Sequence, residues 1–460
     1  MTAKPYSLRS FKALAERDSR RGMDLSRTVP AVKDAVVALR ARRESYLKEV
    51  TSLALGSPAR LAARDQFRAD RKGLRQSRDD ALENALQETL IQFERTLEAG
   101  NFSFGLTQAV QLGDRQTYHI SDALDVSFPA KQAASVIRDL RALEVQSRNG
   151  IVRALKEALG KRYAHAIYRL DITSFFDSIP HNELLKRLGS LKRLDSVTST
   201  LVSRLLDEFT VLTGTTVGVP QGVGMSSHLA DFYLHEFDRR MRATPGVLFY
   251  ARYVDDMVLV LEDAAVLDSV KLEIDDELLK LGLTKHPAKT DEIVTADNGD
   301  YPAGSALEYL GYRFTRANGI LTTGLTGNRQ QRRMRRLELT LQSWLDSSPD
   351  AANPNHGHDG MLIDRLRYLA GNTKLLNSKD NVAIGLFFSN SALDADASEL
   401  TDLDAVLDEF RQNHTDKMSE RLQVKMKAIS FVEMFSQRPF YRFSPRKVQR
   451  VIQAWEERTP

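Results

Sequence analysis

The sequence predicts an α+β protein built from three consecutive regions: a helical N-terminal region over 1–100, a mixed region over 101–325 and a helical region over 326–460. Two observations support this division. Apolar residues recur at helical spacing in the first and last regions. The middle region instead carries short apolar and aromatic runs that alternate with Gly- and Pro-containing turns. We therefore expect the sheets, and any site built on them, in the middle region.

The composition is that of a globular protein. A chain of 460 residues with 42% hydrophobic and 27% charged residues is long enough for about two or three domains. No apolar run approaches a membrane span and residues 1–21 are too charged for a secretory signal, so we expect a cytoplasmic protein without membrane contact. Cysteine is absent, which excludes disulfides and thiolate metal sites. The net charge is only +4, but the positive residues are clumped, which favours a basic groove for a polyanion.

Periodicity and turn signals place the individual elements. Helices are predicted over 29–50, 59–97, 130–143, 149–159, 181–188, 226–241, 264–281, 328–345, 361–376, 401–410, 419–435 and 445–457. Strands are predicted over 102–105, 113–120, 166–172, 249–261 as a hairpin, 292–295, and 307–314 paired with 319–322. The basic residues of the first two helices fit a nucleic-acid surface and a solvated helix face equally well.

One short stretch, 249–261, organises the middle region. Two apolar runs flank the adjacent acids Asp255 and Asp256, so the sequence predicts a hairpin with both acids at its tip. A hairpin selected for stability would carry Asn-Gly or Asp-Gly there, and neighbouring like charges repel. The pair is explained if Mg²⁺ binds it, because Mg²⁺ takes carboxylate oxygens and substrate phosphates. A plain polar turn is the alternative interpretation.

A third acid, Asp171, ends the apolar strand predicted over 166–172. Nucleotidyl transfer uses two metal ions about 3.5–4 Å apart, held by acids from different strands. We expect Asp171 and Asp255 to bridge two Mg²⁺ ions, with Mn²⁺ as a substitute, and Asp256 to be an outer or supporting carboxylate. The backbone of Ile172 is a further candidate ligand. Lys289 is a candidate general acid or charge partner for pyrophosphate, because its ammonium group is compact and its stem flexible.

Several residues are candidates for contact with the incoming nucleotide. The ring of Phe176 could lie beneath the sugar and exclude a 2′-hydroxyl, although core packing is its alternative role. The loop that contains Gln221 and Gly222 leaves backbone and an amide free to meet the nucleotide and the templating position. Weaker triphosphate candidates, which could equally be surface charges, are Arg115, Lys131 and Arg148.

Five stretches in order resemble the palm motifs of bacterial reverse transcriptases: 170–179, 218–222, 253–256, 281–283 with Lys289-Thr290, and 309–312. The resemblance covers about residues 105–315. It implies a right-hand polymerase fold with fingers, an antiparallel-sheet palm and a helical thumb, and Mg²⁺-dependent addition of dNTPs to a primer. It also implies that Tyr309, Leu310 and Gly311 form a primer grip. The basic helix that follows is expected to contact the nucleic-acid backbone through Arg332, Arg333 and Arg336.

Two further features resemble one branch of that family. Residues 147–152, and 365–377 followed by 388–390, are similar to the defence-associated reverse transcriptases, most closely the second, b-type enzyme of the two-polymerase type 3 system. This resemblance implies antiphage immunity, a companion reverse transcriptase, a small non-coding RNA, and synthesis of repetitive DNA without an ordinary template. A higher-order oligomer is a separate expectation. Two alternatives remain. One is a template-independent or protein-primed DNA polymerase of abortive-infection type, and the other is a non-catalytic scaffold that binds RNA or a partner polymerase.

Overall fold

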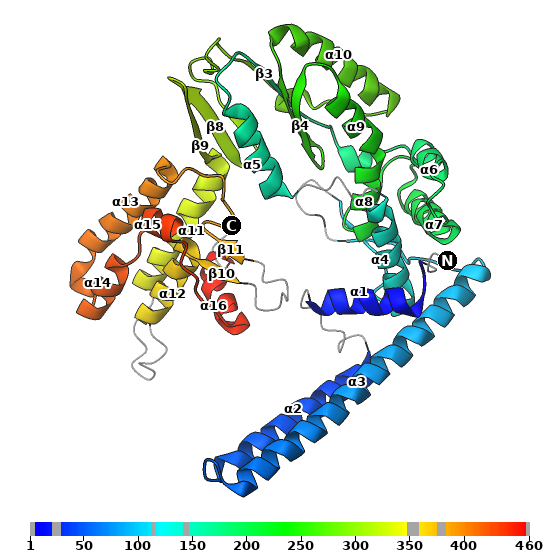
Figure 1. The fold of residues 1–460 in the computed structure, drawn as a ribbon, viewed down its shortest axis with the longest axis vertical. Coiled ribbons are helices and arrows are strands. Elements are labelled where there is room, and N and C mark those ends of the chain that lie inside the picture. Colours follow the sequence, from blue (N-terminus) through cyan, green and yellow to red (C-terminus); the bar gives the residue numbers. More distant parts are fainter. Residues whose placement is uncertain are drawn as a thin grey trace. The chain divides into compact units, whose positions relative to one another are not determined.

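The structure is a computed structural model that describes residues 5–20, 29–109, 111, 116–140, 147–346, 358–374 and 383–456 (Figure 1). The chain forms two compact units. The first unit comprises Met1–Glu144, Thr173–Glu236 and Leu279–Leu283, and the second comprises Val145–Ile172, Phe237–Leu278 and Thr284–Pro460. The units are therefore interleaved along the sequence, whereas the three regions expected from the sequence are consecutive. Helices and antiparallel sheets together confirm the predicted α+β class.

The first unit is mostly helical. Its helices are α1 (Leu8–Arg20), α2 (Pro30–Thr51), α3 (Pro58–Glu98), α4 (Leu124–Asp139), α6 (His181–Gly189), α7 (Ser196–Thr213) and α8 (Gly224–Tyr233). A 3₁₀ turn, η2 (Phe175–Asp177), precedes α6. The small sheet predicted from 102–105 and 113–120 is confirmed only in part. Residues 102–105 form no strand, and the two short strands that pair are β1 (Thr107–Gln108) and β2 (Tyr118–His119).

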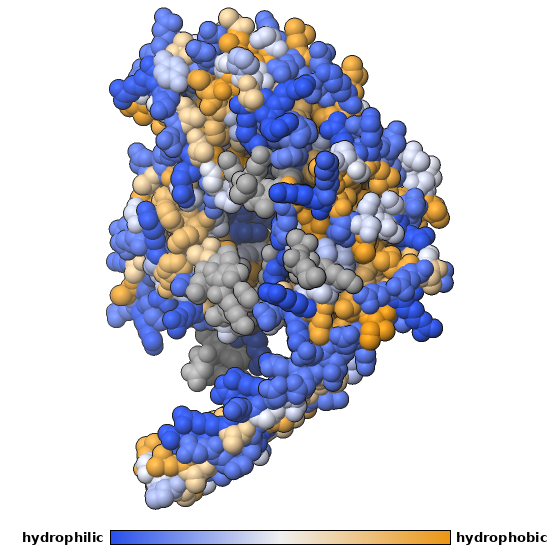
Figure 2. All heavy atoms as spheres, turned by 45° about the vertical axis from the view of Figure 1, so that its right-hand side comes forward, coloured by the Kyte–Doolittle hydropathy of each residue, from blue (hydrophilic) through white to orange (hydrophobic). Residues whose placement is uncertain are grey.

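Helix α2 and the N-terminal half of α3 lie side by side as an antiparallel arm (Figure 1). The ring of Tyr46 stacks on Phe67 with centroids 4.3 Å apart, and Arg42 binds Asp70 at 2.6 Å. Figure 2 shows this arm as largely hydrophilic, with hydrophobic residues gathered at its tip. Leu55, in the turn between the two helices, is 88% exposed. The C-terminal half of α3 is instead buried against α1 and α4.

A four-stranded antiparallel sheet forms one half of the second unit, in the order β4-β5-β3-β6. Its strands are β3 (Ala166–Asp171), β4 (Val247–Tyr253), β5 (Asp256–Leu261) and β6 (Asp291–Val294). The same part of the second unit contains three helices and one 3₁₀ turn. These are α5 (Arg148–Leu159), α9 (His235–Ala243), α10 (Ala264–Lys280) and η3 (Pro287–Lys289). Strands β3 and β5 are buried on both faces over most of their length, because almost every residue in them is apolar.

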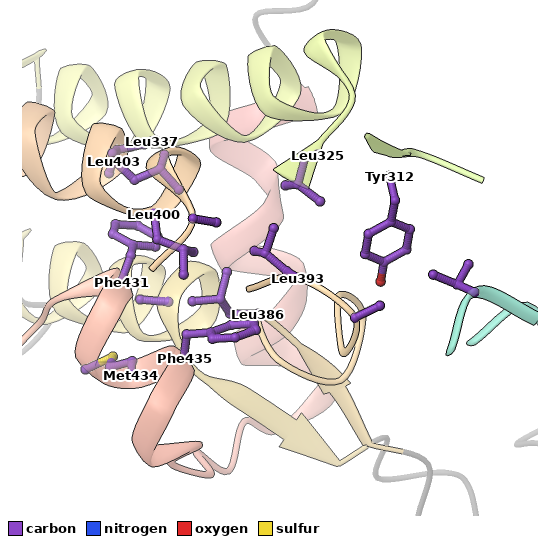
Figure 3. Close-up of a cluster of buried hydrophobic side chains, with 14 of the residues drawn as sticks. Tyr312, Leu325, Leu337, Leu386, Leu393, Leu400, Leu403, Phe431, Met434 and Phe435 are labelled. Atoms are coloured by element: carbon purple, nitrogen blue, oxygen red, sulfur yellow. The ribbon is translucent and has the colours of Figure 1, made fainter. Parts of the chain in front are cut away.

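The rest of the second unit is a small sheet followed by helices. A three-stranded antiparallel sheet contains β7 (Leu307–Tyr309), β8 (Tyr312–Ala317) and β9 (Ile320–Leu325). Next come α11 (Gly327–Asp346), α12 (His358–Ala370), β10 (Asn372–Lys374), β11 (Ala383–Gly385), α13 (Ser398–Asn413), η5 (Thr415–Lys417), α14 (Glu420–Lys427), α15 (Phe431–Gln437) and α16 (Pro445–Glu456). Figure 3 shows Leu337 of α11, Leu400 and Leu403 of α13, and Phe431 of α15 pointing into one buried cluster.

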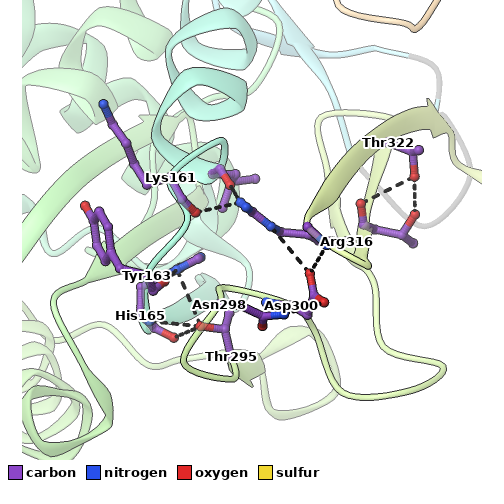
Figure 4. Close-up of polar contacts among 11 residues, drawn as sticks. Lys161, Tyr163, His165, Thr295, Asn298, Asp300, Arg316 and Thr322 are labelled. Carbon is purple, nitrogen blue, oxygen red and sulfur yellow. Dashed lines mark hydrogen bonds and ion pairs between the residues drawn. The ribbon is translucent and has the colours of Figure 1, made fainter.

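A buried polar layer holds the start of β3. Arg316 of β8 donates to the carbonyl oxygens of Leu159 at 2.7 Å and Lys161 at 2.6 Å (Figure 4). Immediately before β3, the His165 N–H donates to the hydroxyl of Thr295, which follows β6, at 2.9 Å. These bonds satisfy backbone groups that burial would otherwise leave unpaired. They therefore fix the segment between α5 and β3, and this sets the position and direction of β3, which ends at Asp171.

Some elements differ from the sequence prediction. Helix α7 was not predicted. The helix predicted over 226–241 is two helices, α8 and α9, and the one over 361–376 ends at Ala370, because the following residues pair as β10 with β11. The helix predicted over 419–435 is also split, into α14 and α15. The break occurs because Asp404 accepts the N–H groups of Phe431 at 2.6 Å and Val432 at 3.1 Å, which starts a new helix there.

Candidate active site

The three acids predicted from the sequence lie at one end of the four-stranded sheet. Asp171 of β3 and Asp256 of β5 are directly opposite partners, and opposite residues of paired strands project to the same face. Asp255 immediately precedes β5, and its carbonyl accepts the N–H of Ile172 at 3.2 Å. Asp171 is only 6% exposed. The pairing of two apolar strands thus brings acids that are 84 positions apart in sequence (255 − 171) to one edge.

The tip of the acidic hairpin is one residue earlier than the sequence predicts. Tyr253 pairs with Asp256, so the loop residues are Val254 and Asp255, and Asp256 is the first residue of β5. Val254 has φ 63°, a conformation that is strained for a β-branched side chain. The strand pairing on both sides fixes this turn. The strained conformation of Val254 is thus part of a turn that makes Asp256, and not Asp255, the direct partner of Asp171.

A buried ion pair supports the same turn. Arg252 of β4 donates to Asp238 of α9 through Nε and Nη2, both at 2.6 Å, and through Nη1 to the carbonyl of Val254 at 2.7 Å. The hydroxyl of Tyr250 also donates to Asp238, at 2.7 Å, and burial raises the pKa of Tyr250 well above its usual value. Arg252 thereby connects a buried carboxylate to the strained turn that carries Asp255.

Arg169 holds the carboxylate of Asp256. Its Nε lies 3.1 Å from Oδ1 and its Nη2 3.4 Å from Oδ2, and it also reaches Asp291 at 3.4 Å. Burial raises the pKa of Asp256 to about 6; Arg169 opposes this rise, whereas Asp171 and Asp255 add to it. Both carboxylate oxygens of Asp256 face a guanidinium group, which suits a supporting role. Crowded negative charge remains at this edge, and a divalent cation would relieve it.

Lys289 lies beside the first acid. Its Nζ is 2.8 Å from Oδ2 of Asp171, and its side chain is half exposed. The 3₁₀ turn η3 is positioned by a bond from the His286 N–H to the carbonyl of Asp171 at 2.7 Å. The structure therefore brings Lys289 to the acids as a charge partner of Asp171.

The donor set at this edge fits Mg²⁺ or Mn²⁺ shared with a substrate. Mg²⁺ sites of this kind use one or two carboxylates, waters and substrate phosphates. At such a site Asp171 and Asp255 would supply the carboxylates, and Ile172 would add a backbone carbonyl next to Asp171. Among the described residues no group of three His, Cys, Asp or Glu side chains could hold a metal ion by itself. The arrangement thus fits a site completed by phosphate oxygens better than a closed protein cage.

The nucleotide-contact candidates of the first unit form one cluster. The carbonyl of Phe176 accepts the N–H of Val219 at 2.8 Å, which joins η2 to the loop over 218–222. The carbonyl of Gln221 accepts the N–H of Tyr118 at 2.7 Å. Gly222 has φ 97°, and a Cβ there would lie 2.6 Å from the carbonyl oxygen of Tyr118, so only glycine fits. Phe176 and the Gln221–Gly222 loop are thus held together by backbone bonds.

One of the predicted primer-grip residues, Tyr309, contacts the acidic hairpin. The hydroxyl of Tyr309 donates to the carbonyl of Asp256 at 3.1 Å, and burial raises the pKa of Tyr309. Leu310 (φ 48°) and Gly311 (φ 77°) form the two-residue turn between β7 and β8. Arg148, expected near the nucleotide phosphates, binds the carbonyl of Leu310, and its guanidinium lies 5.4 Å from the ring centroid of Tyr312.

The remaining predicted residues have different surroundings. Lys131 of α4 pairs with Asp18 at 2.7 Å. Arg115 lies outside the described residues. Arg332, Arg333 and Arg336 project from α11 and line a cavity in the second unit. Sequence reasoning missed Arg169, although its position two residues before Asp171 places both side chains on one face of the strand and could have indicated it.

Comparison with known proteins assigns the middle of the chain to a class. The sequence profile of the family "Reverse transcriptase (RNA-dependent DNA polymerase)" matches residues 120–314. That span includes the acids, Lys289 and the turn at Leu310. Residues 120–314 are therefore similar to a reverse transcriptase domain, and this match covers a little less than half of the chain. No curated protein sequence matches the chain.

Several solved structures are similar at low identity. Apo telomerase from Candida tropicalis, truncated from the C-terminal domain, shares 13% identity (TM-score 0.36), with 51% of this chain and 59% of that chain covered. Telomerase from Candida albicans with the TWJ fragment of telomeric RNA shares 14% (TM-score 0.33), covering 71% and 56%. The corresponding Candida tropicalis complex shares 13% (TM-score 0.37), covering 81% and 68%. This chain thus spans under three fifths of the first two, and likeness at this level does not extend to their ligands. None of the described helices is long and apolar enough to cross a membrane.

Proposed function

We propose that the chain is a reverse transcriptase that adds dNTPs to a 3′-hydroxyl by a two-metal mechanism. The observation that supports this most strongly is the meeting of Asp171, Asp255 and Lys289 at one sheet edge inside a reverse transcriptase domain. Asp171 is 6% exposed and lies beside two further carboxylates, and negative charge crowded in this way is costly for folding, so the convergence favours a catalytic role.

Each residue receives a role in this proposal. Asp171 and Asp255, with the carbonyl of Ile172, would hold Mg²⁺ or Mn²⁺, and the bound ion would lower the pKa of the attacking hydroxyl and neutralise charge on the phosphates. Asp256 keeps its bond with Arg169 and supports the sheet edge. Lys289 releases Asp171 and donates a proton to, or pairs with, the departing pyrophosphate. The nucleotide-contact and primer-contact roles are carried by Phe176, Gln221, Gly222, Tyr309, Leu310, Gly311, Arg332, Arg333 and Arg336.

Primer extension by the purified full chain tests the activity. We expect incorporation of labelled dNTPs on a DNA primer annealed to an RNA template in Mg²⁺, and its loss in EDTA. A parallel reaction without template, containing single dNTPs, tests the alternative polymerase: product that migrates with the denatured protein would identify protein priming. No incorporation in either reaction, with or without co-purifying partners, would favour the non-catalytic scaffold.

Lys289→Met is expected to lower the rate of incorporation by about 10²-fold, because it removes a proton donor and charge partner. Lys285→Met is the matched control. Lys285 lies four positions away and pairs with Asp275 at 2.7 Å and with the hydroxyl of Tyr168 at 3.2 Å, not with Asp171. Single-turnover extension at saturating primer separates chemistry from binding. Equal rates for the two variants would remove Lys289 from the mechanism.

We also infer a role in antiphage defence, together with a non-coding RNA and a companion reverse transcriptase. In support, the stretches that resemble defence-associated enzymes meet in the second unit. The Asn149 side chain donates to the carbonyl of Phe388 at 3.2 Å, and the Phe388 N–H donates to Oδ1 of Asn372 at 3.4 Å. Residues 375–377 of one stretch lie outside the described residues.

Sequencing of co-purified RNA and plaque assays on bacteria that express the chain with its neighbouring genes test this role. We expect one abundant small RNA, and protection that disappears in the Asp255→Asn variant. Protection that survives this substitution would argue for a scaffold in place of a polymerase. The absence of any enriched RNA would remove the proposed RNA partner.

A further inference from the structure

The C-terminal part of the second unit contains a cavity that the candidate active site does not use. Its volume is about 340 Å³, within the range of small-ligand pockets. Four arginines of α11 line one side, namely Arg329, Arg332, Arg333 and Arg336, and Tyr368 of α12 and Trp455 of α16 lie among the other lining residues. The backbone near Gly385 of β11 contributes to the remaining wall.

The cavity is strongly cationic. No Asp or Glu belongs to its lining, and none of its four arginines forms an ion pair within the described part of the chain. Burial, together with the charges of Arg329 and Arg336, lowers the pKa of Arg333 to about 10. Like charges held this close repel one another at a cost to folding, unless an anion joins them. The lining therefore indicates an anionic ligand with more than one negative charge.

Aromatic groups lie beside the arginines. The rings of Tyr368 and Trp455 have centroids 5.9 Å apart, and the guanidinium of Arg336 lies 5.4 Å from the Trp455 ring. The indole N–H of Trp455 donates to the hydroxyl of Thr340 at 3.0 Å, which fixes the ring. Aromatic faces and guanidinium planes both stack on nucleic-acid bases. The same cavity thus offers a place for several phosphates and a place for a base.

We propose that this cavity binds a terminal nucleoside polyphosphate, with its phosphates on Arg329, Arg332 and Arg333 and its base against Trp455. Internal backbone carries one charge per phosphate along an extended strand. A terminal triphosphate instead concentrates its charge in a small volume, which matches four convergent guanidinium groups. Both a free nucleoside triphosphate and the 5′-triphosphate end of an RNA strand have this chemistry. The inference deepens the nucleic-acid contact proposed for α11, and its test requires no polymerisation.

Tryptophan fluorescence of the full chain measures the binding. The chain has two tryptophans, and Trp344 is only 4% exposed, so quenching by a ligand reports on Trp455. The titrations are made in EDTA, which prevents cation-dependent nucleotide binding at the acids. The probes are GTP and two RNA 10-mers of one sequence, with either a 5′-triphosphate or a 5′-hydroxyl. We expect the 5′-triphosphate RNA to bind at least about tenfold more tightly than the 5′-hydroxyl RNA.

Variants assign this preference to the cavity. Arg333→Gln is expected to reduce it to less than about twofold. Arg335→Gln, which removes the same charge from an exposed position of α11 outside the cavity lining, is expected to leave it unchanged. Trp455→Phe should abolish the quenching. If Arg333→Gln lowers the melting temperature, Arg332→Gln, which removes another of the proposed phosphate contacts, replaces it.

Each outcome bears on the proposal. If GTP binds as tightly as the 5′-triphosphate RNA, a free nucleoside triphosphate is sufficient to occupy the cavity. If GTP binds much more weakly, the ligand is the 5′-triphosphate end of an RNA strand. Equal binding of the two RNAs, or equal losses in the Arg333 and Arg335 variants, overturns the proposal and leaves backbone contact alone. A chain that fails in primer extension but retains this preference would refute the polymerase function and not the cavity.

Discussion

Replacing both Asp255 and Asp256 with alanine is expected to abolish dNTP incorporation while the chain stays folded. Asp255 belongs to the proposed metal-holding pair, and Asp256 faces Asp171 across the β3–β5 ladder. Without these carboxylates the developing charge on the phosphates is not neutralised, so we expect a loss on the order of 10³-fold or more in single-turnover primer extension. Melting curves and circular dichroism verify that the fold persists.

The single variants separate the two acids. Asp255→Asn should lose as much activity as the double variant, whereas Asp256→Asn should lose less, because Asp256 is bonded to Arg169 and supports the edge. Asp291→Asn is the control. This substitution removes the charge of the other acid that Arg169 contacts. The Asp291 side chain is 57% exposed and has no proposed role in metal binding, so the variant should retain activity. Full activity of the double variant would exclude the metal assignment.

Replacing Asp238 with alanine is expected to destabilise the chain by about 3–5 kcal/mol. The side chains of Asp238 and Arg252 are only 2% and 4% exposed, so the substitution leaves a buried guanidinium group and the Tyr250 hydroxyl without their acceptor. Denaturant-induced unfolding measures the loss. Because Arg252 also binds the Val254 carbonyl, the acidic turn should loosen, and incorporation measured well below the melting temperature should fall as well.

A surface ion pair of the same unit provides the comparison. Glu292 of β6 binds Lys271 at 3.0 Å, and both side chains are substantially exposed. Glu292→Gln is expected to cost less than about 1 kcal/mol, because water screens such pairs and their side chains lose entropy on pairing. Similar losses for Glu292→Gln and Asp238→Ala would show that burial of the Asp238–Arg252 pair has no special importance for stability.

Local sequence signals predicted the parts of the site that depend on strand patterning. The apolar runs before Asp171 and around Asp255 specified two buried strands, which pair with Asp171 opposite Asp256. The positions of the three acids at one edge follow from that register. Lys289 was also identifiable, because its motif follows the helix that returns the chain to the sheet.

Features that depend on distant contacts were not predictable. The hairpin tip is displaced by one residue because Val254 accepts a strained conformation that its own propensity disfavours. The link from Asp238 to Arg252 joins a helix to a strand, and no spacing rule indicates it. The arginine-lined cavity draws on α11, α12, β11 and α16, so its aromatic wall became visible only once these elements were placed together. Helix α7 contains many β-branched residues, which weaken the helical signal.

The interleaving of the two units has a consequence for synthesis on the ribosome. The first unit lacks its last piece until residues 279–283 have emerged, and that piece is anchored by the Tyr233 hydroxyl on the carbonyl of Leu281 at 2.7 Å. The second unit in turn draws its first strand from Val145–Ile172. Neither unit can therefore finish folding before parts of the other have been translated, and nascent chains stopped before residue 283 should remain protease-sensitive and aggregation-prone.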